Sequence, residues 1–168
     1  MNTSPTSVSV DIAAVGASRF KLGMRRLAAG VSLVTSAHHG VHVGFIATSV
    51  TSVSAEPPTL LVCANRATTA HDPIDASGVF CVNLLGRGDE DICAQFSSSR
   101  RRNERFRDGE WAETGTGSRA LASAMAWFDC IVEHRIRHYS HTIFLARVIE
   151  TRLGDTAEAL VYFEQRYL

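Results

Sequence analysis

Short stretches in which apolar residues alternate with polar ones, or follow one another without a break, recur along this chain at strand length. The longest, residues 41–54, begins directly after His39-Gly40, a pair typical of a tight turn, and leads to a double proline. Residues 59–64 form a continuous apolar run of the length of a buried strand. Further strands are predicted at residues 31–37, 79–85, 126–137, 142–153 and 159–167. This pattern predicts a protein built mainly from β-strands.

Helical spacing is limited to three short segments. Phe20, Met24 and Leu27 recur at the spacing of one helix face. Residues 72–78 end at a glycine, a residue that commonly terminates helices. Residues 89–97 carry acidic side chains near their start, where the helix dipole favours them. We therefore expect three short helices beside the strands.

Most of the predicted strands follow one another with short connections, which leave little room for crossover helices. This order favours an antiparallel meander or a Greek key. Closure of the sheet into a barrel would also remove its exposed edges. Residues 98–123 are polar and are expected to form a loop region. The pattern alone thus predicts a small antiparallel β-barrel with peripheral helices.

Length and charge narrow the class of protein. A chain of 168 residues with 45% hydrophobic and 20% charged residues is typical of one globular domain. A formal net charge of zero argues against a nucleic-acid binder, and no apolar run approaches the ~20 residues of a membrane span. Residues 1–17 lack the features of a signal peptide and are expected to form a flexible arm ahead of a domain at 18–168.

The four cysteines, Cys63, Cys81, Cys93 and Cys130, lie at wide and irregular spacings without a C-x-x-C motif. This spacing favours reduced cysteines over a disulfide or zinc framework. We therefore expect a cytoplasmic protein without a metal site.

Small hydroxyl and amide residues gather at the ends of two neighbouring predicted strands. The first group is Ala47, Thr48 and Ser49, and the second is Asn65, Thr68 and Thr69. Their N–H and hydroxyl groups suit a phosphate and a polyhydroxyl chain, because each oxygen of such a ligand needs a donor. The same residue types also suit the solvated face of a strand and an ordinary turn. The residues alone leave both interpretations open.

This part of the chain resembles the short-chain flavin reductases, the reductase components of two-component flavin-dependent monooxygenases. Residues 46–58 match the family pattern T-A-S-S-F-x-S-V-S-x-x-P-P, and residues 63–71 match C-x-N-x-x-S-x-x-H. Ile46 departs from the first pattern by replacing a threonine, and Ala67 replaces a serine that is common in the family. Further matching segments are residues 24–31, 80–84, 105–106, 126–130, 141–144 and 162–167.

The resemblance implies a fold and an activity. The fold is mainly β, a six-stranded antiparallel split β-barrel of Greek-key type with short peripheral helices, usually a homodimer with flavin near the subunit interface. The activity is reduction of FMN or FAD by NADH or NADPH, followed by transfer of the reduced flavin to a separate monooxygenase. No side chain is predicted to be catalytic, since the cofactors carry the hydride. The alternative is a non-catalytic flavin- or haem-binding module on the same barrel.

The resemblance also assigns cofactor contacts. It places Ala47, Thr48 and Ser49 at the ribityl chain and ring edge, and Thr68 and Thr69 at the phosphate. The expected cofactor-binding residues are Ala47, Thr48, Ser49, Ala64, Asn65, Arg66, Thr68, Thr69, Arg105 and His141. For Arg66, a flavin contact and a plain surface charge are both left open.

The run of arginines at residues 100–107 is the densest positive charge in the chain. A solvated loop and a nucleic-acid patch are two interpretations of such a run. Arg105-Phe106 matches the D-R-F motif of the family, which implies a lid segment near the flavin phosphate or the diphosphate of a dinucleotide. The planar guanidinium of arginine suits both groups.

Histidines are the remaining candidates. His38, His39 and His42 lie around one turn without a nearby acid or thiol, so we favour surface histidines over a metal site. His141 matches the histidine of the family's G-D-H motif, which is associated with nicotinamide dinucleotide binding. Tyr139-Ser140 replaces the preceding Gly-Asp, and the choice between NADH and NADPH stays open.

Overall fold

The computed structural model describes residues 15–98, 100–155 and 157–168. Of the predicted arm at 1–17, residues 1–14 lie outside the described residues. Within the described ranges, no helix is both long and apolar enough to cross a membrane.

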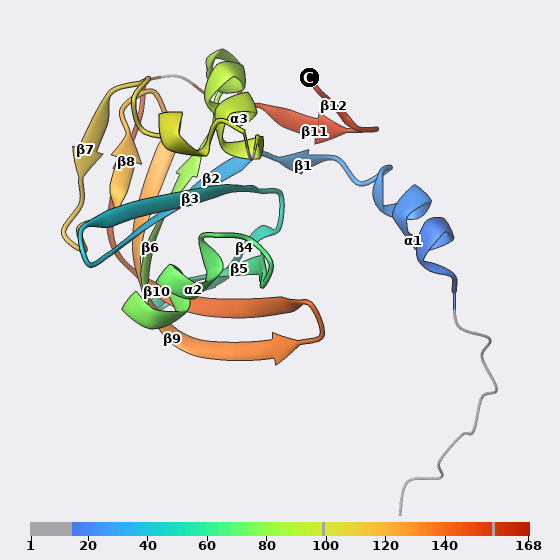
Figure 1. The fold of residues 1–168 in the computed structure, drawn as a ribbon, viewed down its shortest axis with the longest axis horizontal. Helices are drawn as coiled ribbons and strands as arrows, with labels where there is room; N and C mark the ends of the chain where they lie inside the picture. Colours follow the sequence, from blue (N-terminus) through green and yellow to red (C-terminus); the bar gives the residue numbers. More distant parts are fainter. Residues whose placement is uncertain (1–14, 99, 156) are drawn as a thin grey trace, which may run out of the picture.

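Twelve strands, three α-helices and two 3₁₀ turns make up the described chain (Figure 1). The helices are α1 (Ala17–Met24), α2 (His71–Ser77) and α3 (Glu90–Ser97), and the 3₁₀ turns are η1 (Arg87–Asp89) and η2 (Arg102–Glu104). The strands are β1 (Ala29–Gly30), β2 (Ser32–His38), β3 (Val41–Ala47), β4 (Val50–Ala55), β5 (Pro58–Asn65), β6 (Val79–Leu84), β7 (Trp111–Glu113), β8 (Arg119–Leu121), β9 (Ala126–His138), β10 (His141–Leu153), β11 (Val161–Phe163) and β12 (Arg166–Tyr167).

The main sheet has seven antiparallel strands in the order β3-β2-β6-β9-β10-β5-β4. In a flat sheet, strand spacings of about 4.8 Å would hold β3 and β4 nearly 30 Å apart. The chain from Ala47 to Val50 reaches at most about 11 Å. The sheet must therefore curl into a barrel, with Thr48-Ser49 joining its two edges, and the Cys63 N–H donates to the Ser49 carbonyl at 3.3 Å next to the β4–β5 ladder.

The predicted class, a mainly β antiparallel barrel with short helices, is confirmed, but the main sheet has seven strands and not six. The difference arises because the predicted strand 41–54 breaks at Thr48-Ser49. Before the break Ala47 pairs with Ser32 of β2, and after it Val50 pairs with Val62 of β5. The one predicted strand thus forms both edge strands of the main sheet, β3 and β4.

Two smaller predictions were wrong. The predicted strand 159–167 is a hairpin of β11 and β12, which turns at Glu164 and Gln165 with φ of 47° and 64°. The polar region 98–123 contains the paired strands β7 and β8. The predicted turn at His39-Gly40 is present, with φ of 49° and 75°.

The core lies in two clusters separated by β2, because successive side chains of a strand point to opposite faces. Val34 faces the barrel interior with Phe80 and Phe144. Leu33 faces the other way, toward Phe96 of α3. This second cluster holds α3 against β2 and so fixes one wall of the cleft described below.

All four cysteines are free thiols, and Cys81, Cys93 and Cys130 are buried. Burial raises the pKa of each of these three thiols. They therefore stay protonated near neutral pH and act as small apolar side chains.

Helix α1 stands away from the barrel in Figure 1. It has no buried residue, and Phe20 and Leu22 are 60% and 57% exposed. A helix was predicted here from Phe20, Met24 and Leu27, but it ends at Met24, so Leu27 lies beyond it, and its apolar face contacts no core within the described chain.

Candidate functional site

A cleft of about 440 Å³ lies among three segments that are distant in sequence. Its walls are residues 44–46 of β3, the turn that follows β5, and the end of α3 together with the loop around η2. Polar side chains from this lining are Thr68, Thr69, Ser97, Arg102 and Arg105. We call this site the basic cleft. Its volume lies in the usual range for small-molecule sites, about 300–1,000 Å³.

The turn that carries Thr68 is organised by Asn65. The Oδ1 atom of Asn65 accepts the Ala67 N–H at 2.9 Å, and its carbonyl accepts the N–H and the hydroxyl of Thr68 at 3.0 and 2.9 Å. Such a turn is a common role for asparagine. Asn65 thus holds Thr68 at the wall of the basic cleft.

Arg105 ties two walls of the basic cleft together. Its Nη1 donates to the Gly44 carbonyl of β3 at 3.1 Å, and its Nη2 donates to the Phe96 carbonyl of α3 at 2.7 Å. The guanidinium carbon also lies 5.4 Å from the centre of the Phe96 ring. Burial, and then the positive charge of Arg102, lower the pKa of Arg105. Arg105 is therefore a partly buried cation bound mainly to backbone carbonyls.

Arg102 and Ser97 also line the basic cleft, although neither was singled out from the sequence. Arg102 is exposed and belongs to η2. The motif match pointed to Arg105, and the remaining arginines of the run gave no signal that would separate them. Among the described residues that line the basic cleft, none is acidic.

Thr48 and Ser49 directly follow β3, just beyond the residues 44–46 that line the basic cleft. They line a cleft of about 480 Å³, the α1 cleft, together with Phe20 and Met24 of α1 and Tyr162 of β11. The strand from 44 to 48 connects the basic cleft to the α1 cleft over about 13 Å, at about 3.3 Å per residue. The first donor group thus directly follows β3, and Thr68 and Thr69 of the second border the C-terminal half of the same strand.

Within the first donor group, the Ser49 hydroxyl already donates to the Cys63 carbonyl at 3.0 Å. The side chains of Ala47 and Ala64 belong to the barrel core. Contacts from these two alanines to any ligand would have to come from their backbones.

His141 begins β10 and lies directly opposite Asn65 in the β5–β10 ladder. Its Nδ1 is 2.9 Å from the Ser140 hydroxyl. The Arg66 N–H donates to the Ser140 carbonyl at 2.8 Å. The fold therefore gathers Asn65, Arg66 and His141 beside the turn that carries Thr68.

His71 is a buried histidine that contacts this region. It is 3% exposed, its Nε2 lies 2.8 Å from the Thr142 hydroxyl, and its N–H donates to the Thr68 carbonyl at 3.2 Å. The sequence analysis placed His71 within a motif but gave it no role. Its contacts join α2 to β10 and to the end of the Thr68 turn.

The family called "Flavin reductase like domain" matches residues 24–168 of this chain. The chain belongs to this family. The resemblance drawn from residues 46–58 and 63–71 is therefore confirmed. The family match covers every predicted cofactor-binding residue.

Relatives of known name agree with this assignment. The chain is 40% identical over 165 residues to the FMN reductase (NADH) RutF of Pseudomonas syringae, covering 98% of this chain and 93% of the relative. It is 29% identical to BorF, the flavin reductase component of a bacterial two-component tryptophan halogenase, with a TM-score of 0.82 and coverage of 90% and 96%. It is 26% identical to an NADH:FAD oxidoreductase of Streptomyces globisporus in complex with NAD and FAD fragments, with a TM-score of 0.83 and coverage of 90% of each chain.

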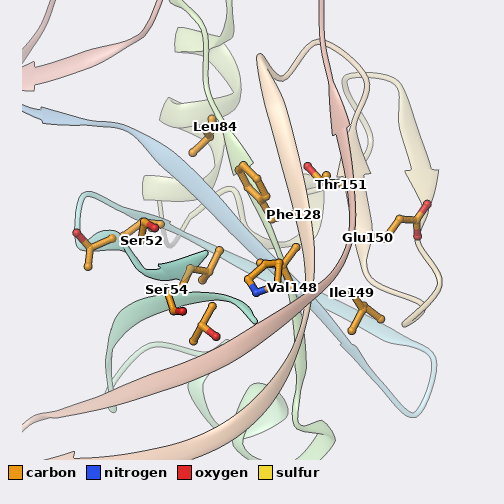
Figure 2. Close-up of a pocket in the computed structure, with 13 residues that line it drawn as sticks. Ser52, Ser54, Leu84, Phe128, Val148, Ile149, Glu150 and Thr151 are labelled. Carbon is orange, nitrogen blue, oxygen red and sulfur yellow. The ribbon is translucent and has the colours of Figure 1, made fainter. Parts of the chain in front are cut away.

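A larger cavity, of about 630 Å³, opens at one end of the barrel of this flavin reductase-like domain. We call it the barrel mouth. Figure 2 shows Leu84, Phe128 and Val148 grouped inside it, with Glu150 toward its rim. None of the ten predicted cofactor-binding residues lines it. The basic cleft is the better site for a phosphorylated ligand, because hydrogen-bond donors and positive charge decide phosphate binding and cavity size does not.

Proposed function

We propose that this protein is a flavin reductase that uses NADH to reduce FMN. The observation that carries the proposal is the basic cleft, where the Thr68 turn and two arginines line one space and no acidic residue lines the described wall. That donor set fits the phosphate end of a flavin. The relatives named as FMN reductases (NADH) support the same substrates.

In this arrangement the flavin phosphate lies in the basic cleft and the ribityl chain follows β3. The ring edge reaches Thr48 and Ser49 at the α1 cleft. Flavin accepts a hydride from NADH and a proton from solvent, which gives reduced flavin and NAD⁺. The protein residues bind and orient the two substrates, since hydride transfer requires alignment more than acid–base groups.

His141 is assigned to NADH. It begins β10 opposite Asn65, its side chain is exposed, and it does not line the basic cleft. Arg66 and Ser140 lie beside it, joined by their backbone hydrogen bond. NADH thus approaches from the β5–β10 side while the flavin phosphate is held on the β3 side.

A homodimer is part of the proposal. The exposed apolar face of α1 and the apolar barrel mouth are both surfaces that a monomer leaves in water. A second copy of the chain is the proposed partner that covers these surfaces, because most soluble oligomers are symmetric homo-oligomers. The α1 cleft adjoins the apolar face of α1, so a second copy that covers this helix face lies near the flavin ring.

The reduced flavin is passed to a separate monooxygenase component. Structural relatives whose names describe components of two-component systems support this step. We place the protein in the cytoplasm, where NADH is available and where free buried thiols such as Cys81 remain reduced.

The test is a matrix of reactions with the purified protein, in which NADH or NADPH is combined with FMN, FAD or no flavin. We expect rapid NADH oxidation only when flavin is present, with hydrogen peroxide formed in air. Oxygenated product should appear only after a cognate monooxygenase is added, even across a dialysis membrane that passes only flavin. Flavin binding without NADH oxidation would instead support a non-catalytic module, and substrate oxygenation by this chain alone would contradict the reductase assignment.

A further inference from the structure

Two arginines three residues apart line the basic cleft, but their guanidinium groups are used differently. Both Nη atoms of Arg105 donate to carbonyls, with Nη2 also 3.4 Å from the Ser98 carbonyl. Its Nε is buried and has no partner among the described residues. Most of the hydrogen-bonding capacity of Arg105 is therefore directed at the protein itself.

Arg102 makes no comparable contact with the described residues. No ion pair joins its side chain to any residue of 15–98, 100–155 or 157–168. The adjacent Arg101 differs, because its Nε lies 3.0 Å from Oε2 of Glu104 and its Nη2 lies 3.9 Å from Oδ2 of Asp108. Arg102 is thus the guanidinium at the basic cleft whose donors remain available for a ligand.

The two cations are also close enough to affect each other. The charge of Arg102 contributes, after burial, to the lowered pKa of Arg105. Two like charges beside a cleft without a lining carboxylate repel each other, and a bound anion relieves that repulsion. Thr69 adds a hydroxyl donor beside the same space, whereas the Thr68 hydroxyl already donates to the Asn65 carbonyl.

We propose that Arg102 is the residue that recognises the phosphate of the flavin, and that Arg105 is a positioning residue that ties β3 to α3 at the correct spacing. This inference rests on the proposed function. It makes phosphorylated flavins the preferred substrates, and it assigns the preference for FMN over riboflavin to Arg102. A phosphate monoester carries about −1.5 to −2 charges at neutral pH, and the planar fork of arginine pairs with two of its oxygens.

The test measures the dissociation constants of FMN and riboflavin for the wild-type protein and its variants by quenching of flavin fluorescence. Arg102→Ala should weaken FMN binding about tenfold, the loss expected for a hydrogen bond to a charged group, and should change riboflavin binding less than twofold. Arg102→Lys keeps the charge and should recover most of the FMN affinity. Arg107→Ala is the matched control, because it removes one positive charge from the same exposed loop without touching the basic cleft.

Arg105 is tested by the ratio of the two dissociation constants. Arg105→Ala should weaken FMN and riboflavin by similar factors, because the cleft wall moves for both. Arg105→Lys should behave like the alanine variant, since lysine lacks the fork that bridges the carbonyls of Gly44 and Phe96. Circular dichroism identifies the variants that fold. Arg102→Ala decides the main claim, because the Arg102 side chain is exposed and its removal should leave the fold intact.

Three results would overturn the inference: a wild-type protein that binds both flavins equally, an Arg102→Ala variant that keeps the preference for FMN, or a preference lost in Arg105→Ala and restored by lysine. These outcomes differ from a failure of the proposed function. In that case the wild-type protein would not oxidise NADH with any flavin.

Discussion

The basic cleft and the barrel mouth are both open cavities of ligand size, but their chemistry differs in almost every respect. The basic cleft has a volume of about 440 Å³ and is lined by two arginines and three hydroxyl residues. The barrel mouth is larger, about 630 Å³, and its inner wall is formed by Leu84, Phe128 and Val148. The first suits a small anion, and the second suits an apolar surface. Positive charge, more than volume or the number of hydroxyl residues, therefore separates the proposed flavin site from the proposed dimer surface.

The strongest test of this comparison places the same new charge in each cavity. Thr68→Glu introduces a carboxylate beside the flavin phosphate and should weaken FMN binding about a hundredfold, roughly 2.7 kcal/mol. Ser52→Glu places the same side chain at the barrel mouth. Calorimetric titration with FMN and sedimentation of both variants distinguish the sites: the first variant should lose flavin and keep its mass, and the second should lose mass. If Thr68→Glu lost mass and Ser52→Glu lost flavin binding, the basic cleft would be the dimer surface and the barrel mouth the flavin site.

The barrel mouth can be tested by itself at Ile149, which lines it and is 41% exposed. Ile149→Arg should raise the dissociation constant of the dimer about tenfold or more, because an unpaired charge would be buried between the two copies. Analytical ultracentrifugation over a range of concentrations measures this change. Val41→Arg is the control, since Val41 is 62% exposed and does not line the barrel mouth. An unchanged dimer in the Ile149 variant would exclude this surface as the interface.

A third test separates NADH from flavin. His141→Ala should raise the KM for NADH about fivefold, roughly 1 kcal/mol, with kcat and FMN binding less affected. The reason is that His141 does not line the basic cleft, where the flavin phosphate is placed. Steady-state kinetics with each substrate varied in turn provides the measurement. A collapse of FMN affinity at unchanged KM for NADH would move His141 to the flavin site.

The smallest expected effect is that of salt. Raising the ionic strength from about 0.05 to 0.5 M should weaken FMN binding about threefold, because exposed charges such as Arg102 are screened. Riboflavin binding and the dimer should respond little, since neither depends mainly on charge. Titrations at matched pH would reveal the difference, and equal salt sensitivity for both flavins would argue against an electrostatic basic cleft.

Local patterns predicted the parts of this fold that depend on local physics. The turn at His39-Gly40 and the helix ending at Gly78 were visible because each uses a residue suited to positive φ. The turn at Glu164 and Gln165 lacked that signal and was missed. The break at Thr48-Ser49 was also missed, because residues on both sides have the same strand pattern. Closure of the barrel decides that break, and closure is a property of the whole sheet.

The candidate site shows the same limit. Thr68 and Thr69 were predicted through a motif, and they do line one cleft with Arg105. Arg102 was not singled out, because five arginines within eight residues look alike in sequence. Its place is set by η2 and by the Arg101 contacts with Glu104 and Asp108. The sequence therefore indicated which kinds of residue form the site more clearly than which arginine has which role.

The most direct test of the central claim is a crystal structure of the protein with FMN bound. We expect the phosphate in the basic cleft, within hydrogen-bond distance of the Thr68 hydroxyl and the Arg102 guanidinium, with the ring toward Thr48 and Ser49. A phosphate found in the barrel mouth, or a flavin that leaves the basic cleft to solvent, would contradict the account.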